Sequence, residues 1–107
     1  MNPEDFYQLF WDYYGPSSQP TANHFHHHLV EFLKREIPNF DSLKDSEINQ
    51  LSGVEEHTPL HHSVWCTLPE SDARKVAQIL KAKRGHQIAL NEIPNLYFSS
   101  HFKKDTP

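Results

Sequence analysis

The sequence predicts an α+β domain with about four helices packed on one face of a small three-stranded sheet, in the order ααα-β-α-β-β. Apolar residues recur at helical spacing in four segments, and in other, shorter segments they alternate with polar residues, as in a strand. Each of the three glycines also follows a helix-like segment, where helices commonly end. With 107 residues the chain has the length of one domain. We therefore expect residues 1–107 to form a single domain, with a frayed tail at 103–107.

Residues 3–14, PEDFYQLFWDYY, are predicted to form the first helix, with a cap at Asn2 and an end at Gly15. On a helical wheel the large side chains form two adjacent stripes: Phe6, Leu9, Phe10 and Tyr13 on one, and Tyr7, Trp11 and Tyr14 on the other. This apolar arc is about twice as wide as that of an ordinary surface helix, so one packing partner cannot cover it.

Three more helices are expected further along the chain. The second runs from Thr21 to Ile37 and ends before Pro38, because a residue that precedes proline avoids the helical conformation. A short third helix covers 45–52, with Gly53 after it. The fourth follows Pro69 and ends at Gly85.

Three segments are expected to be strands. From His61 to Leu68 apolar and polar residues alternate, and a second strand begins at His86. A turn at 91–95 leads to a last strand over 96–102. If the first two strands are neighbours, the helix between them makes them parallel, whereas the turn makes the last pair antiparallel.

Composition narrows the possible functions. The net charge of −4 is concentrated in the first half of the chain, which argues against binding to a nucleic-acid backbone. The single cysteine gives no internal disulfide, and there is neither a secretion signal nor the run of roughly 20 apolar residues that spans a membrane. These observations predict a cytoplasmic protein that does not enter the membrane.

The aromatic surface of the first segment suggests a binding function. Tyrosine and tryptophan are enriched at binding hot spots, and a surface with no visible partner is often shared by two copies of one chain. We therefore expect a non-enzymatic interaction module that forms a homodimer or binds another protein. Its expected interface residues are Tyr7, Phe10, Trp11 and Tyr14.

The nine histidines provide a second hypothesis, that of a metal-binding protein for Zn²⁺ or Ni²⁺. On the second predicted helix, His24 with His28 and His27 with Glu31 are four residues apart and share a face. A third ligand could come from His57, His61 or His62. Adjacent histidines on a helix point about 100° apart, and a solvated polar face with no bound metal is the competing interpretation.

Catalytic chemistry has little support in the sequence. Cys66 is expected on the inner face of its strand, where a thiol is buried and inert. The sequence has no glycine-rich phosphate loop and no GxSxG elbow. A small-ligand or enzymatic pocket between the first helix and the sheet is a third possibility. No segment matches a family motif.

Overall fold

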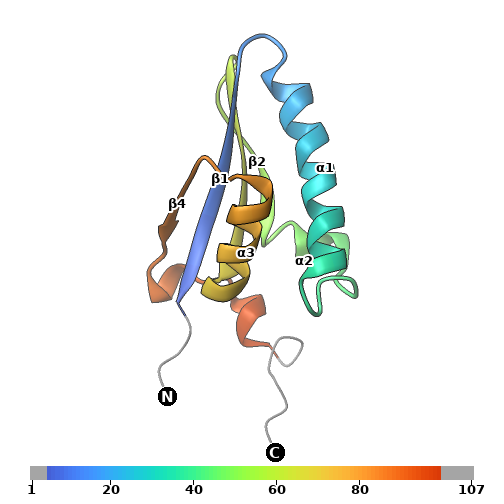
Figure 1. The fold of residues 1–107 in the computed structure, drawn as a ribbon, viewed down its shortest axis with the longest axis vertical. Coiled ribbons are helices and arrows are strands. Elements are labelled where there is room, and N and C mark those ends of the chain that lie inside the picture. The colour runs from blue at the N-terminus through green and yellow to red at the C-terminus, as the bar shows by residue number, and fades with distance from the viewer. Residues whose placement is uncertain (1–4, 100–107) are drawn as a thin grey trace, which may run out of the picture.

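The computed structural model describes residues 5–99 and contains one mixed domain of strands and helices (Figure 1). In chain order the elements are β1 (Phe6–Tyr14), α1 (Ser18–Glu36), α2 (Asp45–Ile48), β2 (Ser52–Thr58), β3 (His61–Pro69), α3 (Glu70–Leu80), β4 (Arg84–Gln87) and the 3₁₀ helices η1 (Leu90–Glu92) and η2 (Asn95–Phe98). None of the helices among these residues is long and apolar enough to cross a membrane.

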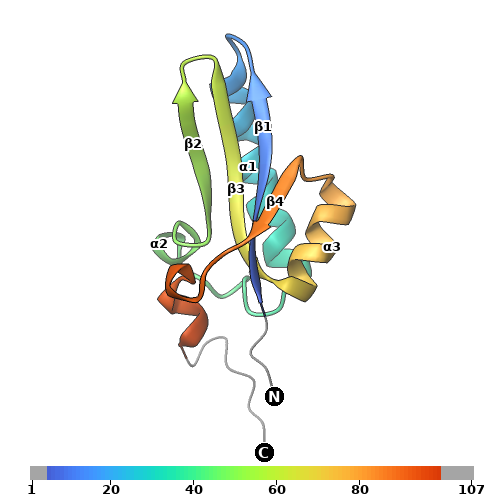
Figure 2. The ribbon, with the colours of Figure 1, turned by 90° about the vertical axis from the view of Figure 1, so that its left-hand side faces the viewer.

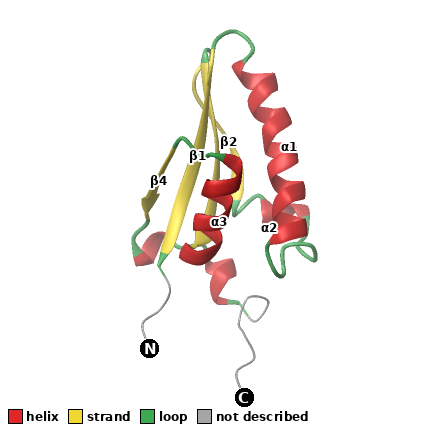
Figure 3. Cartoon of the chain, in the orientation of Figure 1, coloured by secondary structure: helices red, strands yellow, loops and turns green. Residues whose placement is uncertain are grey.

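The four strands form one antiparallel sheet in the order β2-β3-β1-β4. Apart from the short α2, the elements follow each other as βαββαβ, and each βαβ unit places one of its strands between the two strands of the other. This is the split βαβ, or ferredoxin-like, topology. Both long helices, α1 and α3, cover the same face of the sheet (Figures 2 and 3).

The prediction of a helix at residues 3–14 was wrong, because residues 6–14 form the central strand β1. Phenylalanine, tyrosine and tryptophan favour strands, and β1 has neighbours on both sides, with β3 along its whole length and β4 along part of it. Each of the two predicted aromatic stripes is therefore divided between the two faces of one strand. Leu9, Trp11 and Tyr13 point toward the helices, whereas alternate residues such as Phe10 and Asp12 point to the other face.

The predicted count of about four helices on a three-stranded sheet was also wrong, since the structure has three α-helices and a four-stranded sheet. Strand β2 was missed because Gly53 was interpreted as a helix end. A Cβ atom at this position would lie 3.0 Å from the Trp65 indole nitrogen, so glycine makes room for a side chain of the neighbouring strand.

The expected pairing of the last strands was wrong as well. The sheet places β3 and β4 on opposite sides of β1, so they are not neighbours, and all paired strands are antiparallel. Residues 95–98 form η2 rather than a strand, and Ser99 directly follows it. Residues 100–102 of the expected strand and the tail at 103–107 lie outside the described residues. The Tyr97 hydroxyl donates a hydrogen bond to the Thr67 carbonyl and covers one end of the open sheet face.

Other predicted elements agree with the structure. Helix α1 ends before Ile37, α2 is short, β3 begins at His61, and α3 begins after Pro69. Helix α3 stops earlier than predicted, because Lys81 adopts the left-handed conformation that was assigned to Gly85. The core lies between the sheet and the helices, where β1 and β3 meet α1 and α3; its fully buried side chains include Leu29, Leu33, Val64, Cys66, Leu68 and Val76.

Candidate metal centre

A cluster of polar side chains lies on the open face of the sheet, near the turn that joins β2 to β3. The register pairs Asp12 of β1 with Ser63 of β3, and Ser63 with Glu55 of β2. Side chains that are directly opposite each other in paired strands share a face. Asp12 points away from the helices, because its neighbour Trp11 points toward them. Three strands thus bring these polar groups together (Figure 2).

Asp12 is the centre of this cluster. Its Oδ2 accepts a hydrogen bond from Arg84 Nε at 3.0 Å, and its Oδ1 accepts one from Arg84 Nη2 at 3.1 Å. Oδ1 also accepts a bond from Ser63 Oγ at 2.5 Å and lies 3.2 Å from His61 Nε2. The hydrogen bonds from Arg84, supported by those from Ser63 and His61, hold the pKa of Asp12 well below its ordinary value, against the opposing effect of burial. Asp12 is therefore ionised, as a metal ligand must be.

Two imidazole rings border this carboxylate. The rings of His57 and His61 have centroids 4.3 Å apart, and Tyr14 stacks on the other side of His61 at the same distance. His57 Nε2 lies 2.8 Å from Ser63 Oγ. Since the Ser63 hydroxyl donates to Asp12, His57 Nε2 donates to Ser63. The Nε2 atoms of both rings are consequently directed at the polar cluster.

The separations suit three ligands of one metal ion after a small rearrangement. One ligand atom each from Asp12, His57 and His61 lie within 4.8 Å of one another. Ligand bonds of 2.0–2.2 Å around tetrahedral zinc place ligand atoms about 3.4 Å apart. The His61 to Asp12 separation of 3.2 Å already has this size, and the His57 side chain is 30% exposed, so it has room to move. In the hydrogen bonds described above, the Nε2 atoms of His57 and His61 carry the proton. To bind a metal through Nε2, each imidazole would have to carry its proton on Nδ1 instead.

The histidines predicted on α1 form a different group. His24 Nε2 and His28 Nε2 are 3.0 Å apart, and His28 Nδ1 lies 3.5 Å from Glu31 Oε1. His27 Nε2 is 3.8 Å from the same Glu31 oxygen. All four residues are exposed on the helix. The two predicted pairs on α1, His24 with His28 and His27 with Glu31, are thus in contact. The predicted third ligand His61 does not join them, because it lies in the cluster on the open face of the sheet.

His62 belongs to neither group. As a neighbour of His61 in a strand it points to the opposite face, where it is 2% exposed. Its Nδ1 lies 2.7 Å from Ser18 Oγ, and its Nε2 lies 3.0 Å from Glu56 Oε1. Nδ1 therefore links β3 to the start of α1, and Nε2 links it to the neighbouring strand β2.

The four expected interface residues are separated by the alternation of β1. Trp11 is 4% exposed and its Nε1 donates to the Leu80 carbonyl at 2.9 Å, while Phe10 is 6% exposed under the Arg84 guanidinium. Tyr7 is half-buried against the core. Tyr14, at 72% exposed, is the member of this set that presents a large surface to solvent.

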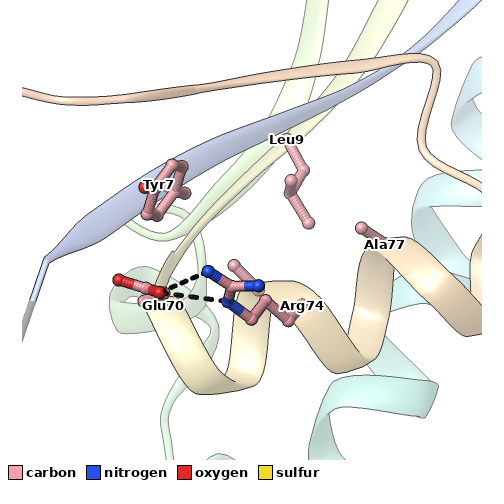
Figure 4. Close-up of a pocket in the computed structure, with 6 residues that line it drawn as sticks. Tyr7, Leu9, Glu70, Arg74 and Ala77 are labelled. Atoms are coloured by element: carbon pink, nitrogen blue, oxygen red, sulfur yellow. Dashed lines mark hydrogen bonds and ion pairs between the residues drawn. The ribbon is translucent and has the colours of Figure 1, made fainter.

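A hollow of about 160 Å³ lies between β1 and α3 (Figure 4). Tyr7, Leu9, Ala73 and Ala77 line it, and Arg74 and Glu70 form an ion pair beside it. The pocket expected between a first helix and the sheet is not present as predicted, because the first segment is itself a strand of the sheet. The lining of the hollow carries no histidine, and its two charged residues, Glu70 and Arg74, are paired with each other.

His57 and His61 were candidates from the sequence, but Asp12 was missed; it lies in the segment predicted as the first helix and in neither of its aromatic stripes. The three residues are brought together by the register of β1 and of β2 against β3, and spacing along the chain does not contain that register. Residues 9–13 show no clear alternation of apolar and polar side chains, so the sequence contains no local signal for this site. The chain matches no protein-family model, and neither a curated protein nor a solved structure matches it.

Proposed function

We propose that this protein binds one divalent transition metal ion, Zn²⁺ or Ni²⁺, through Asp12, His57 and His61. The observation that carries the proposal is the convergence of two imidazoles and an ionised carboxylate from three strand segments on one point. Imidazole nitrogen combined with carboxylate oxygen suits both ions, and three protein ligands leave a coordination position for solvent or a ligand.

The surroundings of the site support this reading. Ser63 and Arg84 hold the Asp12 carboxylate in place, and Tyr14 fixes the His61 ring by stacking. Groups that orient metal ligands in this way raise affinity, because less freedom is lost on binding. Arg84 Nε contacts Oδ2, so Oδ1 can serve the metal while that hydrogen bond remains.

The test is a calorimetric titration of metal-free protein with Zn²⁺ and, separately, with Ni²⁺. We expect one ion per chain, and an affinity at least about 10-fold lower in His57→Ala and in His61→Ala. The matched control is His28→Ala, which removes an exposed histidine from the pair on α1. Should His28→Ala abolish binding while His61→Ala leaves it unchanged, the metal is held on α1 and the proposal is wrong.

A second candidate function is the interaction module, with self-association as its simplest form. The supporting observation is an exposed apolar end of the molecule: Tyr14 is 72% exposed and Leu60 is 55% exposed, and the Gly15 amide donates to the Leu60 carbonyl at 2.8 Å. Large exposed apolar side chains in neighbouring turns are typical of a binding surface. A cytoplasmic location remains part of this proposal.

Light scattering of the metal-free protein tests the second candidate. Self-association predicts a dimer that Tyr14→Ser with Leu60→Ser converts to a monomer. The control is Ile79→Ser, which changes a similarly exposed apolar residue on α3. A monomeric wild type at high micromolar concentration would remove self-association from consideration.

A further inference from the structure

We infer that the metal-loaded site binds a phosphate group, which contacts the ion on one side and the Arg84 guanidinium on the other. The inference rests on the proposed metal site and names the class of ligand for its open position. It begins from the position of Arg84, whose side chain is 46% exposed at the start of β4. Its guanidinium carbon lies 4.1 Å from the centre of the Phe10 ring, so the group is held over the sheet.

Metal binding changes the partners of this guanidinium. Without metal, Arg84 Nη2 donates to Asp12 Oδ1 at 3.1 Å, while Nε donates to Oδ2 at 3.0 Å. When Oδ1 becomes a metal ligand, one of its lone pairs is directed to the ion and its hydrogen bond from Nη2 is weakened. The other contact of Nη2, to Ser63 Oγ, is long at 3.5 Å, so Nη2 can turn to a new acceptor. The Nε bond to Oδ2 keeps the guanidinium beside the ion. An N–H donor and a coordination position are then adjacent, an arrangement that binds two oxygens of one oxyanion.

The charge of the cluster favours an anion only when the metal is present. Asp12 and Glu55 carry one negative charge each and Arg84 carries one positive charge, so the metal-free cluster is formally negative by one. A divalent ion reverses this to positive by one. An oxyanion is therefore repelled from the metal-free protein and attracted to the loaded one.

Phosphate fits these partners better than a carboxylate. Its several oxygens let one contact the metal while another accepts from Arg84, and the planar guanidinium is well suited to phosphate. Tyr14, stacked on His61 and 72% exposed, adds an aromatic surface beside the same position. A phosphate ester with an aromatic group could stack on this ring, as inorganic phosphate cannot.

The experiment uses the full chain loaded with Co²⁺, which replaces Zn²⁺ and is paramagnetic. Inorganic phosphate is titrated at constant ionic strength while the relaxation of its ³¹P nucleus is measured, since this depends steeply on the distance to the ion. We expect saturable enhancement with the loaded protein and none with metal-free protein. Phenyl phosphate binding more tightly than inorganic phosphate would identify an aromatic ester as the ligand, and equal affinities would identify the free ion.

Arg84→Gln should weaken phosphate binding by about 10-fold or more when wild type and variant are compared at Co²⁺ concentrations that saturate each protein, because the loss of Arg84 also lowers the metal affinity. Arg84→Lys keeps the charge and should give an intermediate loss. The matched control is Arg74→Gln, which removes another ion-paired arginine from a distant helix. Circular dichroism verifies the fold of each variant.

Two outcomes overturn the inference independently of the metal proposal. If Co²⁺ binds through His57 and His61 but phosphate gives no saturable enhancement, the phosphate site is wrong and the metal site stands. If acetate competes as well as phosphate does, the assigned ligand class is wrong. If the ion itself fails to bind to the wild type, the metal proposal fails first and the phosphate site fails with it.

Discussion

Asp12 shows how a single side chain can hold together three strands of this sheet. Its carboxylate accepts hydrogen bonds from Arg84 of β4 and from Ser63 of β3, while its own backbone belongs to β1. The Asp12 side chain is 10% exposed and its partner Arg84 is 46% exposed, so solvent screens this ion pair in part. Replacing the carboxylate would leave the guanidinium without its charged partner, and the cost should appear in the pH dependence of stability.

We predict that Asp12→Asn lowers the free energy of unfolding by about 1–3 kcal/mol at neutral pH. The pKa of Asp12 in the fold lies below its ordinary value of 3.8, chiefly because of Arg84. The stabilisation is therefore complete at neutral pH and is lost as pH falls below about 4 toward the folded-state pKa. Urea unfolding at pH 7, 5 and 3 measures it. A wild-type advantage that stays constant down to pH 3 would contradict the assigned ion pair.

The position of Gly15 requires a backbone conformation that favours glycine. Its φ of +103° is rare for residues with a Cβ atom, although no atom lies within 4 Å of where a Cβ would stand. We predict that Gly15→Ala destabilises the protein by about 1–2 kcal/mol through backbone strain alone. Thermal unfolding measures this cost. Gly85→Ala provides the comparison: its added Cβ would lie 2.9 Å from the buried Leu9 side chain, so any cost there comes from crowding rather than from a positive φ.

At the scale of elements, the sequence predicted the helices better than the strands. Helix α1 has its own periodic stripe of Leu29, Phe32 and Leu33 and ends at a proline, so local information was sufficient. Strand β1 was misassigned because a central strand buries side chains on both faces. Its apolar residues then occur without clear alternation, and such a run is equally compatible with a buried helix.

The candidate metal centre was only partly predictable for the same reason. Histidine content drew attention to His57 and His61, but the carboxylate that completes the set is 45 residues or more away in sequence and adjacent only through strand pairing. The helical pairs His24 with His28 and His27 with Glu31 were found because spacing along a helix is local information. A site whose residues meet only through strand pairing can be predicted only once the order and register of the strands are known.

A prediction at this scale concerns how α3 is attached to β1. The Trp11 Nε1 group donates to the Leu80 carbonyl, which lies at the end of α3. We predict that Trp11→Phe costs about 1–3 kcal/mol, because the carbonyl loses its buried partner and the smaller ring leaves a space. Hydrogen exchange should also become faster in residues 77–84 than in α1. Trp65→Phe, a change on the open face, is the control and should leave exchange in α3 unchanged.

For the whole molecule, two groups of histidines have to be distinguished in any experiment on metal binding. The turns beside Asp12, His57 and His61 lie at one end of the long axis, and the start of β1 and η2 lie at the other (Figure 1). The exposed histidines of α1 are a second source of metal affinity within the same chain. Metal binding should therefore be measured both in the wild type and in a His24→Ala, His28→Ala background, in which the proposed site keeps all its ligands.

The last prediction uses Cys66 to report unfolding of the entire fold. This thiol is fully buried in β3, where strands and helices meet, and burial raises its pKa far above the ordinary value of 9.0. The thiolate is the nucleophile that attacks a thiol reagent, so the native protein offers the reagent neither access nor the reactive form of the cysteine. We predict that labelling by an aromatic disulfide reagent under native conditions occurs only as fast as global unfolding, and that it is immediate in concentrated urea. The rate should rise with urea along the unfolding limb measured by circular dichroism. Rapid labelling of a protein whose circular dichroism stays native would mean that β3 opens locally, and the tightly packed core described here would then be wrong at its centre.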